Sequence, residues 1–412
     1  MGLKKNIVLI TSGQPSANPR LVKEALALYK AGYNVKVIYV PISPWADKFD
    51  EQLFMLYPNI TFIRTGFHPI NNKLAYWWVR FRQKVLVSIF KRLGDLYNIS
   101  DFSLILFGQE LLKEAKKHQA DLYIAHNLGA LPVAFRAALF YGAKVGFDAE
   151  DFHRGEMNAN SLHFILTKIV EDKYFPRLDY FTAASPLIYK EYAVLYNCKK
   201  SKVINNCFPK EHIADSPTFR SPYLPLKLFW FSQKIGKGRG LEDIIIALCV
   251  HLCNEPIELT LVGNCSESMR EYMVNLVPKD IFNNKVKIIN PVSSDDLFSL
   301  ANQHHIGLAL EPGRDLNNEF ALSNKIFTYM LAGNALILSD TQAQKEFYCK
   351  YPQIGSLYKK GNIKDMTDIL RIYLRDPALL SKHQENALRI AGDKLNWDEE
   401  KNIFLELVRS VL

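Results

Sequence analysis

A chain of 412 residues is longer than the roughly 250 to 300 residues at which a single hydrophobic core stops growing, so two domains are expected. Hydrophobic residues make up 48% of the chain, charged residues 23%, and the mean hydropathy is -0.08, which excludes a membrane bundle and a disordered chain. The net charge of +9 indicates an anionic partner: a nucleic acid, an anionic membrane face or a phosphorylated substrate.

The N-terminal residues predict no export signal, because the apolar run Ile7–Ile10 is too short for a signal peptide. We therefore expect a cytoplasmic protein, and a peripheral position at the inner face of the cell membrane stays open. The six cysteines are scattered at spacings that match no common zinc or redox motif, so they are expected to be reduced thiols. The chain also lacks a convincing Asp-x-Asp motif, and no metal is expected.

The first half alternates short β-branched runs with helical patterns. Residues 6–11, 19–31 and 34–39 predict a strand, a helix and a strand. Further strands are expected at 60–63, 122–125, 144–147, 180–183 and 202–204. Strands that alternate with helices predict a parallel, doubly wound α/β sheet.

A basic and aromatic segment occupies residues 73–92. It contains six basic residues and no acidic one, interleaved with aromatic side chains such as Trp77, Trp78 and Phe81. This composition is typical of an amphipathic helix on an anionic bilayer. A partly buried helix whose basic residues lie on a solvated face explains it equally well.

The pattern changes between residues 207 and 227, where four prolines interrupt it, which predicts an interdomain linker. A second α/β unit follows, with strands expected at 228–231, 258–262, 286–289, 306–310 and 335–339 and helices at 241–252 and 324–332. The expected organisation is a first domain at 1–208, a linker at 209–227, a second domain at 228–395 and a terminal helix at 396–412 that crosses back to the first domain.

The ends of the predicted strands carry the candidate site residues. The loop at 11–20 contains a single glycine, Gly13, and lacks the G-x-G-x-x-G pattern, which disfavours a dinucleotide dehydrogenase. Gly13 is either a ligand contact or a plain turn glycine. Arg239 and Lys234 lie at a predicted strand-to-helix junction, where cations and helix amides can hold a diphosphate. Surface solvation is their simpler explanation.

Several segments, taken in order, resemble the retaining glycosyltransferases of GT-B architecture known as family 4. Residues 18–35 (NPRLVKEALALYKAGYNV) resemble the first helix of that family, and 322–333 (LSNKIFTYMLAG) resemble its LPNKLFEYMAAG segment most closely. Shorter matches are found at 121–127, 147–151, 182–186, 203–206, 236–241 and 261–263. The resemblance spans nearly the whole chain.

The resemblance implies two Rossmann-like, doubly wound domains facing across a cleft. It also implies sugar transfer from a nucleotide-diphosphate sugar to a saccharide or lipid-linked acceptor, with retention of configuration. The implied donor-side residues are Gly13, Lys234, Arg239, Ser323, Asn324, Lys325 and Thr328. His126 is implied to contact the donor sugar or support the reacting centre, and Asp148 and Glu150 are acceptor-side candidates.

The chain departs from the family at its paired glutamates, which are separated by seven residues. Glu311 and Glu319 have that spacing, but the better alignment places the pair at Phe320 and Thr328. Glu311 is therefore interpreted as coincidental, and Glu319 is kept as a catalytic candidate close to the register. Thr328 is shorter than glutamate and neutral, so weaker nucleotide binding, an altered donor geometry or lost activity would follow.

Three alternatives remain. A GT-B sugar-nucleotide epimerase would act on the donor without an acceptor, and a non-catalytic homologue would bind a membrane or a partner protein. A nucleic-acid-binding module is the least favoured, because no recognition motif accompanies the positive charge.

Overall fold

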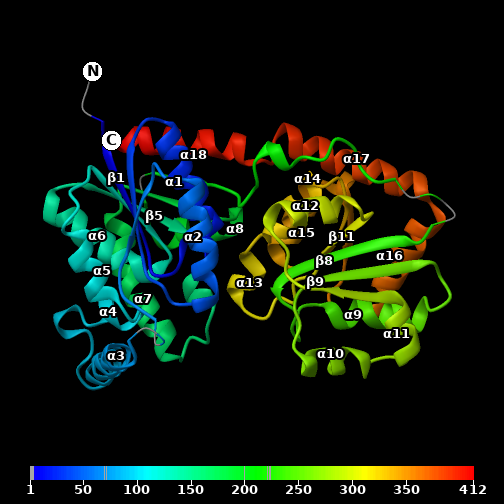
Figure 1. The fold of residues 1–412 in the computed structure, drawn as a ribbon, viewed down its shortest axis with the longest axis horizontal. Coiled ribbons are helices and arrows are strands. Elements are labelled where there is room, and N and C mark those ends of the chain that lie inside the picture. The colour runs from blue at the N-terminus through cyan, green and yellow to red at the C-terminus, as the bar shows by residue number, and fades with distance from the viewer. Residues whose placement is uncertain (1–3, 69, 71, 199, 220, 222–223) are drawn as a thin grey trace. The chain divides into compact units, whose positions relative to one another are not determined.

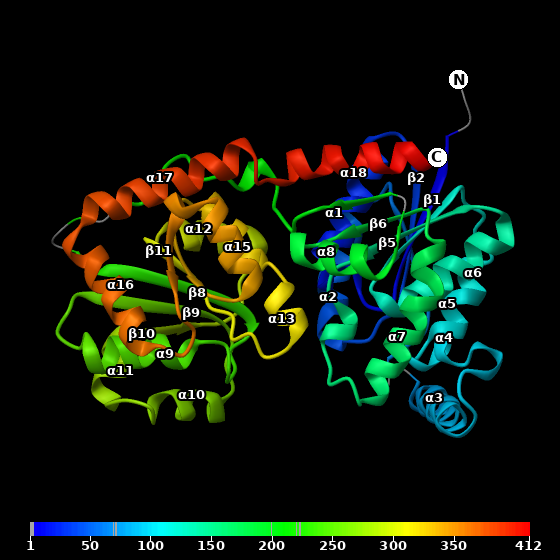
Figure 2. The ribbon, with the colours of Figure 1, turned by 180° about the vertical axis from the view of Figure 1, so that it is seen from behind.

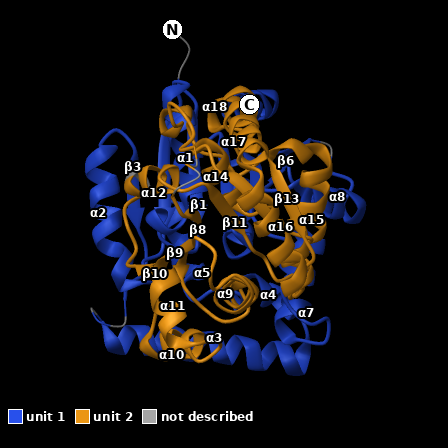
Figure 3. Ribbon diagram, turned by 90° about the vertical axis from the view of Figure 1, so that its right-hand side faces the viewer, with its two compact units in different colours: residues 1–204, 401–412 blue, residues 205–400 orange. Residues whose placement is uncertain are grey.

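The computed structural model describes residues 4–68, 70, 72–198, 200–219, 221 and 224–412 (Figure 1). It divides into two compact units: residues 1–204 with 401–412, and residues 205–400 (Figure 3). The expected linker at 209–227 therefore falls inside the second unit. The second boundary falls inside the last helix, α18 (Trp397–Val411), rather than before it.

The first unit contains a seven-stranded sheet in which every pair of neighbours is parallel. Its order is β3-β2-β1-β4-β5-β6-β7. The strands are β1 (Asn6–Thr11), β2 (Asn34–Tyr39), β3 (Thr61–Arg64), β4 (Leu122–His126), β5 (Lys144–Ala149), β6 (Tyr180–Ala183) and β7 (Ser201–Val203). The doubly wound parallel sheet expected for this half is thus confirmed.

The helices of the first unit begin where capping residues occur in the sequence. At α1, the Asn18 side chain accepts a hydrogen bond from the Leu21 amide at 3.0 Å, and Pro19 takes the first helical position. The chain leaves this helix through Gly32, whose φ is +94°. The helices are α1 (Pro19–Lys30), α2 (Asp47–Leu56), α3 (Lys73–Leu93), α4 (Ser100–Ser103), α5 (Gly108–Ala115), α6 (Leu131–Tyr141), α7 (Leu162–Tyr174) and α8 (Pro186–Leu195).

The second unit contains a six-stranded parallel sheet in the order β10-β9-β8-β11-β12-β13. The strands are β8 (Leu226–Lys234), β9 (Ile257–Asn264), β10 (Val286–Ile289), β11 (Ile306–Ala309), β12 (Ala335–Ser339) and β13 (Gly355–Tyr358). The last strand was not expected from the sequence. A Cβ atom at Gly355 would lie 1.9 Å from the Leu336 carbonyl oxygen, so β13 approaches β12 where only glycine fits.

Helices cover both faces of this sheet, with α9, α10 and α11 on one side and α12, α14 and α15 on the other (Figures 1 and 2). The helix expected at 241–252 is α9 followed by a π-helical turn at Ala247–His251. The helices are α9 (Leu241–Ile246), α10 (Glu267–Val274), α11 (Lys279–Lys285), α12 (Ser294–Asn302), α13 (Leu316–Phe320), α14 (Asn324–Leu331), α15 (Gln342–Lys350), α16 (Ile363–Arg375) and α17 (Pro377–Asp393). No helix in the described parts of the chain is both long enough and apolar enough to cross a bilayer.

The strand order locates the candidate ligand sites. In each unit the first strand lies beside the fourth, β1 beside β4 and β8 beside β11, and the winding of the chain reverses between them. In open α/β sheets, ligands bind outside the carboxyl ends of the strands at such a reversal. The residues that follow β1, β4, β8 and β11 are therefore the candidate ligand contacts.

Candidate functional site

In the second unit, Glu311 follows β11 and lies near two cations, Lys325 from α14 and Arg239 from the loop after β8. The Glu311 Oε1 atom accepts a hydrogen bond from Lys325 Nζ at 2.8 Å. Arg239, from the loop after β8, donates to Ser232 Oγ at 2.9 Å. Burial raises the pKa of the Glu311 carboxyl, but the Lys325 ammonium and, more weakly, the Arg239 charge outweigh it and hold that pKa below its usual value. Glu311 is thus a partly buried carboxylate, 16% exposed, that is bound by Lys325 and also senses the charge of Arg239.

Two glycines allow the Arg239 loop to approach β11. Gly238 and Gly240 have φ values of +65° and +72°, in the left-handed region that favours glycine. A Cβ atom at Gly240 would lie 2.8 Å from the Leu310 Cβ atom, whereas one at Gly238 would have no heavy atom within 4 Å. The run Gly-Lys-Gly-Arg-Gly therefore folds as a tight turn that holds the arginine at the end of the sheet.

Lys325 lies in the first turn of α14 and is buried, with its Nζ atom 5.9 Å from the centre of the Trp230 ring. Asn324 begins the helix, and Ser323 occupies the N-cap position. The Ser323 hydroxyl lies 3.4 Å from Lys325 Nζ instead of capping a backbone amide. The helix N-terminus at this point therefore keeps amide groups that can serve an anion.

Thr328 lies one turn further along α14 and is fully buried. Its hydroxyl donates to the Asn324 carbonyl oxygen at 3.4 Å. The hydroxyl of Thr328 therefore forms its hydrogen bond within its own helix.

Glu319 and Lys234 lie outside the Glu311 contacts. Glu319, in the short helix α13, forms an ion pair with Lys360, and its other oxygen accepts a hydrogen bond from the Gln342 amide at 2.9 Å. Lys234 ends β8, where the pairing with β9 is irregular, and its side chain is exposed. Glu319 thus links two loops of its unit, and Lys234 is a solvated cation at the same sheet edge as Arg239.

In the first unit, three carboxylates surround His126 at the carboxyl end of β4. The imidazole is fully buried, and its nitrogens lie 3.2 Å from Glu24, 3.4 Å from Asp148 and 3.3 Å from Glu150. Burial lowers the pKa of His126, but the surrounding carboxylates outweigh it and raise that pKa well above its usual value. The surrounding carboxylates therefore favour the protonated form of His126.

Arg20 completes this network from α1. Its guanidinium donates to both oxygens of Asp148 at 2.5 and 2.7 Å and also to the Ile204 carbonyl oxygen. Thr182 donates to the same carboxylate at 2.5 Å. Burial alone would raise the pKa of Asp148, yet Arg20 and His126 hold it far below its usual range. The carboxylate of Asp148 is fully engaged.

The side chains of Glu24, His126 and Asp148 are of types that can bind a metal, and their ligand atoms lie within 4.8 Å of one another. Asp148 is already bound at both oxygens by Arg20, and Glu24 faces the His126 imidazolium. These ion pairs account for the cluster by themselves. Burial and the Asp148 charge raise the pKa of Glu24, which the His126 charge opposes.

Glu150 is the member of the network that reaches the surface, with a side chain 24% exposed. It accepts a hydrogen bond from the Asn18 side chain and contacts His126. Asp148 and His126, by contrast, are fully buried. Of His126, Asp148 and Glu150, Glu150 is therefore the one placed to touch a ligand.

Gly13 lies after β1 in an open position, since an added Cβ atom would meet only Ile42, at 3.5 Å. Next to it, Asn127 has a φ of +63° and binds the loop on both sides. Its amide donates to Thr11 Oγ1 at 3.0 Å, and its oxygen accepts from Ser12 Oγ at 2.6 Å. The ends of β1 and β4 are thus tied together by Asn127.

The sequence alone does not predict the roles of Arg20, Glu24 and Glu311. Arg20 and Glu24 are four residues apart and share one face of α1 with Leu21 and Leu28, so charged residues on an apolar face were the available signal. The alignment of the paired glutamates marks Glu311 as coincidental, although it directly follows a predicted buried strand. Its role emerges only when α14 brings Lys325 to it.

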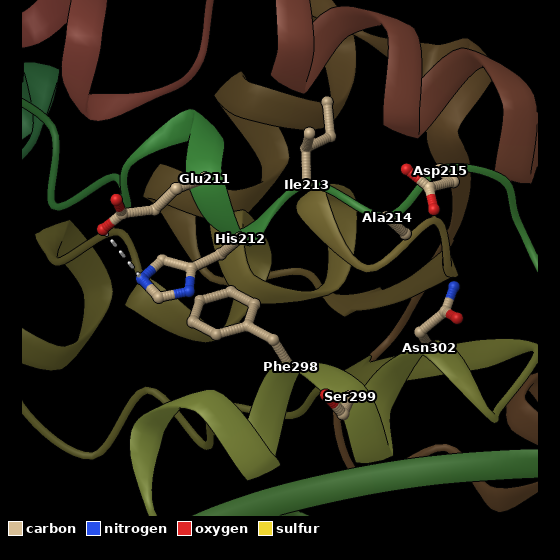
Figure 4. Close-up of a pocket in the computed structure, with 8 residues that line it drawn as sticks. All are labelled: Glu211, His212, Ile213, Ala214, Asp215, Phe298, Ser299 and Asn302. Carbon is tan, nitrogen blue, oxygen red and sulfur yellow. Dashed lines mark ion pairs between the residues drawn. The ribbon is translucent and has the colours of Figure 1, made fainter.

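A separate pocket of about 620 Å³ lies in the second unit (Figure 4). It is lined by residues 211–215 and by Phe298, Ser299 and Asn302. The His212 ring stacks on Phe298, with centroids 4.4 Å apart, and lies 3.8 Å from a Glu211 oxygen. None of the candidate residues described above lines this pocket.

The sequence matches no model of a known family and no curated protein. Solved structures resemble the whole chain. HepE from Anabaena, solved with UDP and glucose, has a TM-score of 0.70 at 15% identity, over 98% of this chain and 100% of that one. Sucrose-phosphate synthase from Thermosynechococcus elongatus has a TM-score of 0.71 at 13% identity, over 99% of both chains. A glycosyltransferase from Rickettsia africae has a TM-score of 0.71 at 13% identity, over 100% of this chain and 99% of that one.

These likenesses, together with the two parallel sheets, define the fold as GT-B, with two Rossmann-like domains. The fold class expected from the sequence is confirmed. At this level of identity the likeness establishes the fold and not the activity.

Proposed function

We propose that the protein is a glycosyltransferase that moves a sugar from a nucleotide-diphosphate sugar to an acceptor. The observation that carries the proposal is the convergence of Arg239, Lys325 and the α14 N-terminus at the strand reversal of the second unit. Structures with this fold include complexes with UDP and with UDP-glucose. The chemistry of the convergent groups suits a ligand of that kind.

A diphosphate leaving group gains negative charge as the bond to the sugar breaks, so the site must supply positive charge at that moment. Arg239 is half-buried, and its bond to Ser232 uses one of five N–H donors. Lys325 is held in position by Glu311. These two cations and the helix amides would supply the charge that a metal supplies elsewhere, so the proposed reaction needs no metal.

The proposal extends to retention of configuration and to a saccharide or lipid-linked acceptor in polysaccharide or glycolipid assembly. Both extensions rest on the family resemblance of the sequence segments. We assign the acceptor-side role to Glu150, because it is the partly exposed member of the buried network. His126 and Asp148 then act as positioning residues that fix Glu150 and the end of β5.

The donor site is tested by titrating the protein with a panel of nucleoside diphosphates and nucleotide sugars, using calorimetry and the thermal midpoint. A ligand that binds only the folded state raises that midpoint. Arg239→Ala should weaken binding of the matching ligand by roughly 10- to 100-fold, since hydrogen bonds to charged groups contribute about 1.5–3 kcal/mol. Arg375→Ala, an exposed arginine on α16, is the matched control and should change nothing.

The outcomes separate the competing functions. Absence of binding by every nucleotide at millimolar concentration contradicts the proposal. Binding without turnover would indicate a non-catalytic homologue, the alternative that Thr328 favours by replacing the family's glutamate. Conversion of the donor without an acceptor would indicate an epimerase or hydrolase. The anomeric proton signal of a transfer product decides between retention and inversion.

A further inference from the structure

Helix α3 exposes an apolar stripe along one side. The side chains are exposed by 86% at Leu74, 60% at Trp77, 61% at Trp78, 58% at Phe81 and 38% at Val85. They follow one another at steps of one, three or four residues, which places them on one face of a helix. The Trp78 and Phe81 rings lie 5.9 Å apart and form a continuous aromatic surface.

A basic row runs beside this stripe. Lys73, Arg80, Lys84 and Lys91 are separated by seven, four and seven residues, so they share the neighbouring face, and all four are exposed. The Arg80 guanidinium lies 5.6 Å from the centre of the Trp77 ring, where the two rows meet. α3 carries no acidic residue in its sequence.

The opposite face fixes the helix to its unit. Val79 and Phe90 are buried there, and α3 contacts α4 at the periphery of the unit (Figures 1 and 2). Arg82 forms a bidentate ion pair with Glu110 at 2.7 Å, and Gln83 donates to the Ser103 carbonyl oxygen at 3.0 Å. The apolar stripe is therefore held outward on an anchored helix, and partial burial of α3 does not account for it.

We propose that this surface, formed by the apolar stripe and the basic row of α3, docks on an anionic phospholipid bilayer. The rings and aliphatic side chains would enter the boundary between headgroups and acyl chains, and the basic row would face the lipid phosphates. Lys84 and Lys91 also line one small pocket, together with Gln83, Val87 and Ser88. A second copy of the same helix is a poor partner, because two basic rows would repel each other.

Docking of this kind would hold the protein at a membrane, where a lipid-linked acceptor is found. The inference does not require the proposed sugar transfer, because bilayer binding is measured without any nucleotide sugar. Failure of one proposal therefore leaves the other intact.

The test is flotation of the full-length protein with vesicles of phosphatidylcholine alone and of phosphatidylcholine mixed with phosphatidylglycerol. We expect binding to the mixed vesicles only, and its loss when salt is raised to about 1 M, where the screening length falls to about 3 Å. Trp78→Ser with Phe81→Ser should abolish it. Phe140→Ser is the matched control, since Phe140 is 61% exposed on α6 of the same unit, and it should bind normally.

Charge is tested separately. Lys84→Gln with Lys91→Gln should weaken binding to the mixed vesicles on the order of 30-fold, about fivefold for each lysine. Lys345→Gln with Lys382→Gln changes the net charge equally at exposed positions of α15 and α17 and should have no effect. Circular dichroism and unchanged thermal midpoints confirm that each variant is folded.

The proposal is overturned if the folded protein does not float with the mixed vesicles, or if both lysine pairs weaken flotation equally. It is also overturned if light scattering shows a dimer that Trp78→Ser with Phe81→Ser dissociates while the wild type leaves vesicles unbound. That last result would assign the surface to a second copy of the chain.

Discussion

At the scale of single residues, Arg20 is the cation that neutralises Asp148 in the buried network of the first unit. It is 2% exposed and holds Asp148 through two short hydrogen bonds, while three carboxylates and one imidazolium share the same interior. Removing one partner of a buried pair is costly, because the other charge stays buried without compensation.

We therefore predict that Arg20→Met lowers the free energy of opening of the β4–β5 region by about 3–5 kcal/mol. Hydrogen exchange of peptides covering these strands measures the opening free energy directly. Arg389→Met is the control, since Arg389 and its partner Asp393 are both 60% exposed, and it should cost at most about 1 kcal/mol. Equal effects of the two substitutions would contradict the charge balance described for the network.

His126 gives this unit a predictable pH dependence. Its pKa is raised well above the usual value of 6.5 in the folded protein, so the folded state holds a proton that the unfolded state releases. The stabilisation is complete below about pH 6.5 and is lost as the pH rises through the folded-state pKa. The pH dependence due to Asp148 has the opposite sign, because the pKa of this carboxyl is lowered in the folded protein. Its contribution to stability is present above about pH 4 and is lost only in acid.

We predict that the thermal midpoint of the first unit decreases as the pH is raised from about 6 to about 9. His126→Gln should remove this dependence of the midpoint on pH. His163→Gln, at an exposed histidine on α7 of the same unit, should leave the slope in place. A wild-type midpoint that stays constant over this range, or a slope that survives His126→Gln, would show that His126 is not held as an imidazolium.

Residue types at strand ends were predictable, but their partners were not. The sequence placed His126, Asp148 and Glu150 at neighbouring strand ends, and the parallel sheet brings them together as expected. The partner Arg20 comes from α1, a long way along the chain, and no local pattern indicates which helix face meets which strand. The same reason explains why Glu311 was interpreted as coincidental.

At the scale of elements, the turn between β8 and α9 positions Arg239, and the two glycines that flank this arginine differ in what surrounds them. Gly240 leaves no room for a Cβ atom, whereas Gly238 has open space, although both have positive φ. The pair separates the effect of crowding from the effect of backbone strain.

We predict that Gly240→Ala weakens donor binding at least tenfold, because the turn must move away from Leu310 and takes Arg239 with it. Gly238→Ala should cost only the backbone strain, about 1–2 kcal/mol of stability, with donor affinity changed little. Calorimetric titration with the nucleotide found in the screen checks both variants. If Gly238→Ala impairs binding as strongly as Gly240→Ala, strain rather than crowding controls the site.

The strands and helices with strong patterns were predictable, and the exceptions have physical reasons. β13 has four residues and begins at a glycine, which is needed there because the strand lies so close to β12. A short run that begins with glycine carries little strand signal in the sequence. α3 was foreseen as amphipathic, but which residues face outward depends on α4 and α5, which the helix contacts.

At the scale of the whole molecule, both sheets follow the same order, with the first strand beside the fourth. The alternation of strands with helices predicted two parallel sheets. The strands themselves could be located because buried parallel strands have continuous apolar sequences. The boundaries were harder to predict. Four prolines suggested a linker, yet residues 205–227 belong to the second unit, where Ala214 donates its amide to the Leu331 carbonyl oxygen at 2.9 Å.

The chain returns to the first unit at residue 401, and this final segment is part of that unit's structure. Phe404 and Val408 are fully buried, and Lys200 donates to the Ser410 carbonyl oxygen. Phe404→Ala with Val408→Ala should therefore destabilise the first unit by roughly 4–10 kcal/mol, since each large-to-small core change costs about 2–5 kcal/mol. Hydrogen exchange should show faster opening in β4 and β5 and unchanged protection in β8 and β11, because residues 205–400 keep their own core.

Leu412→Ala, at the partly exposed C-terminal residue, is the matched control. Equal loss of protection in both units would mean that the molecule unfolds as one cooperative body, and the division at residues 204 and 400 would then have no energetic meaning.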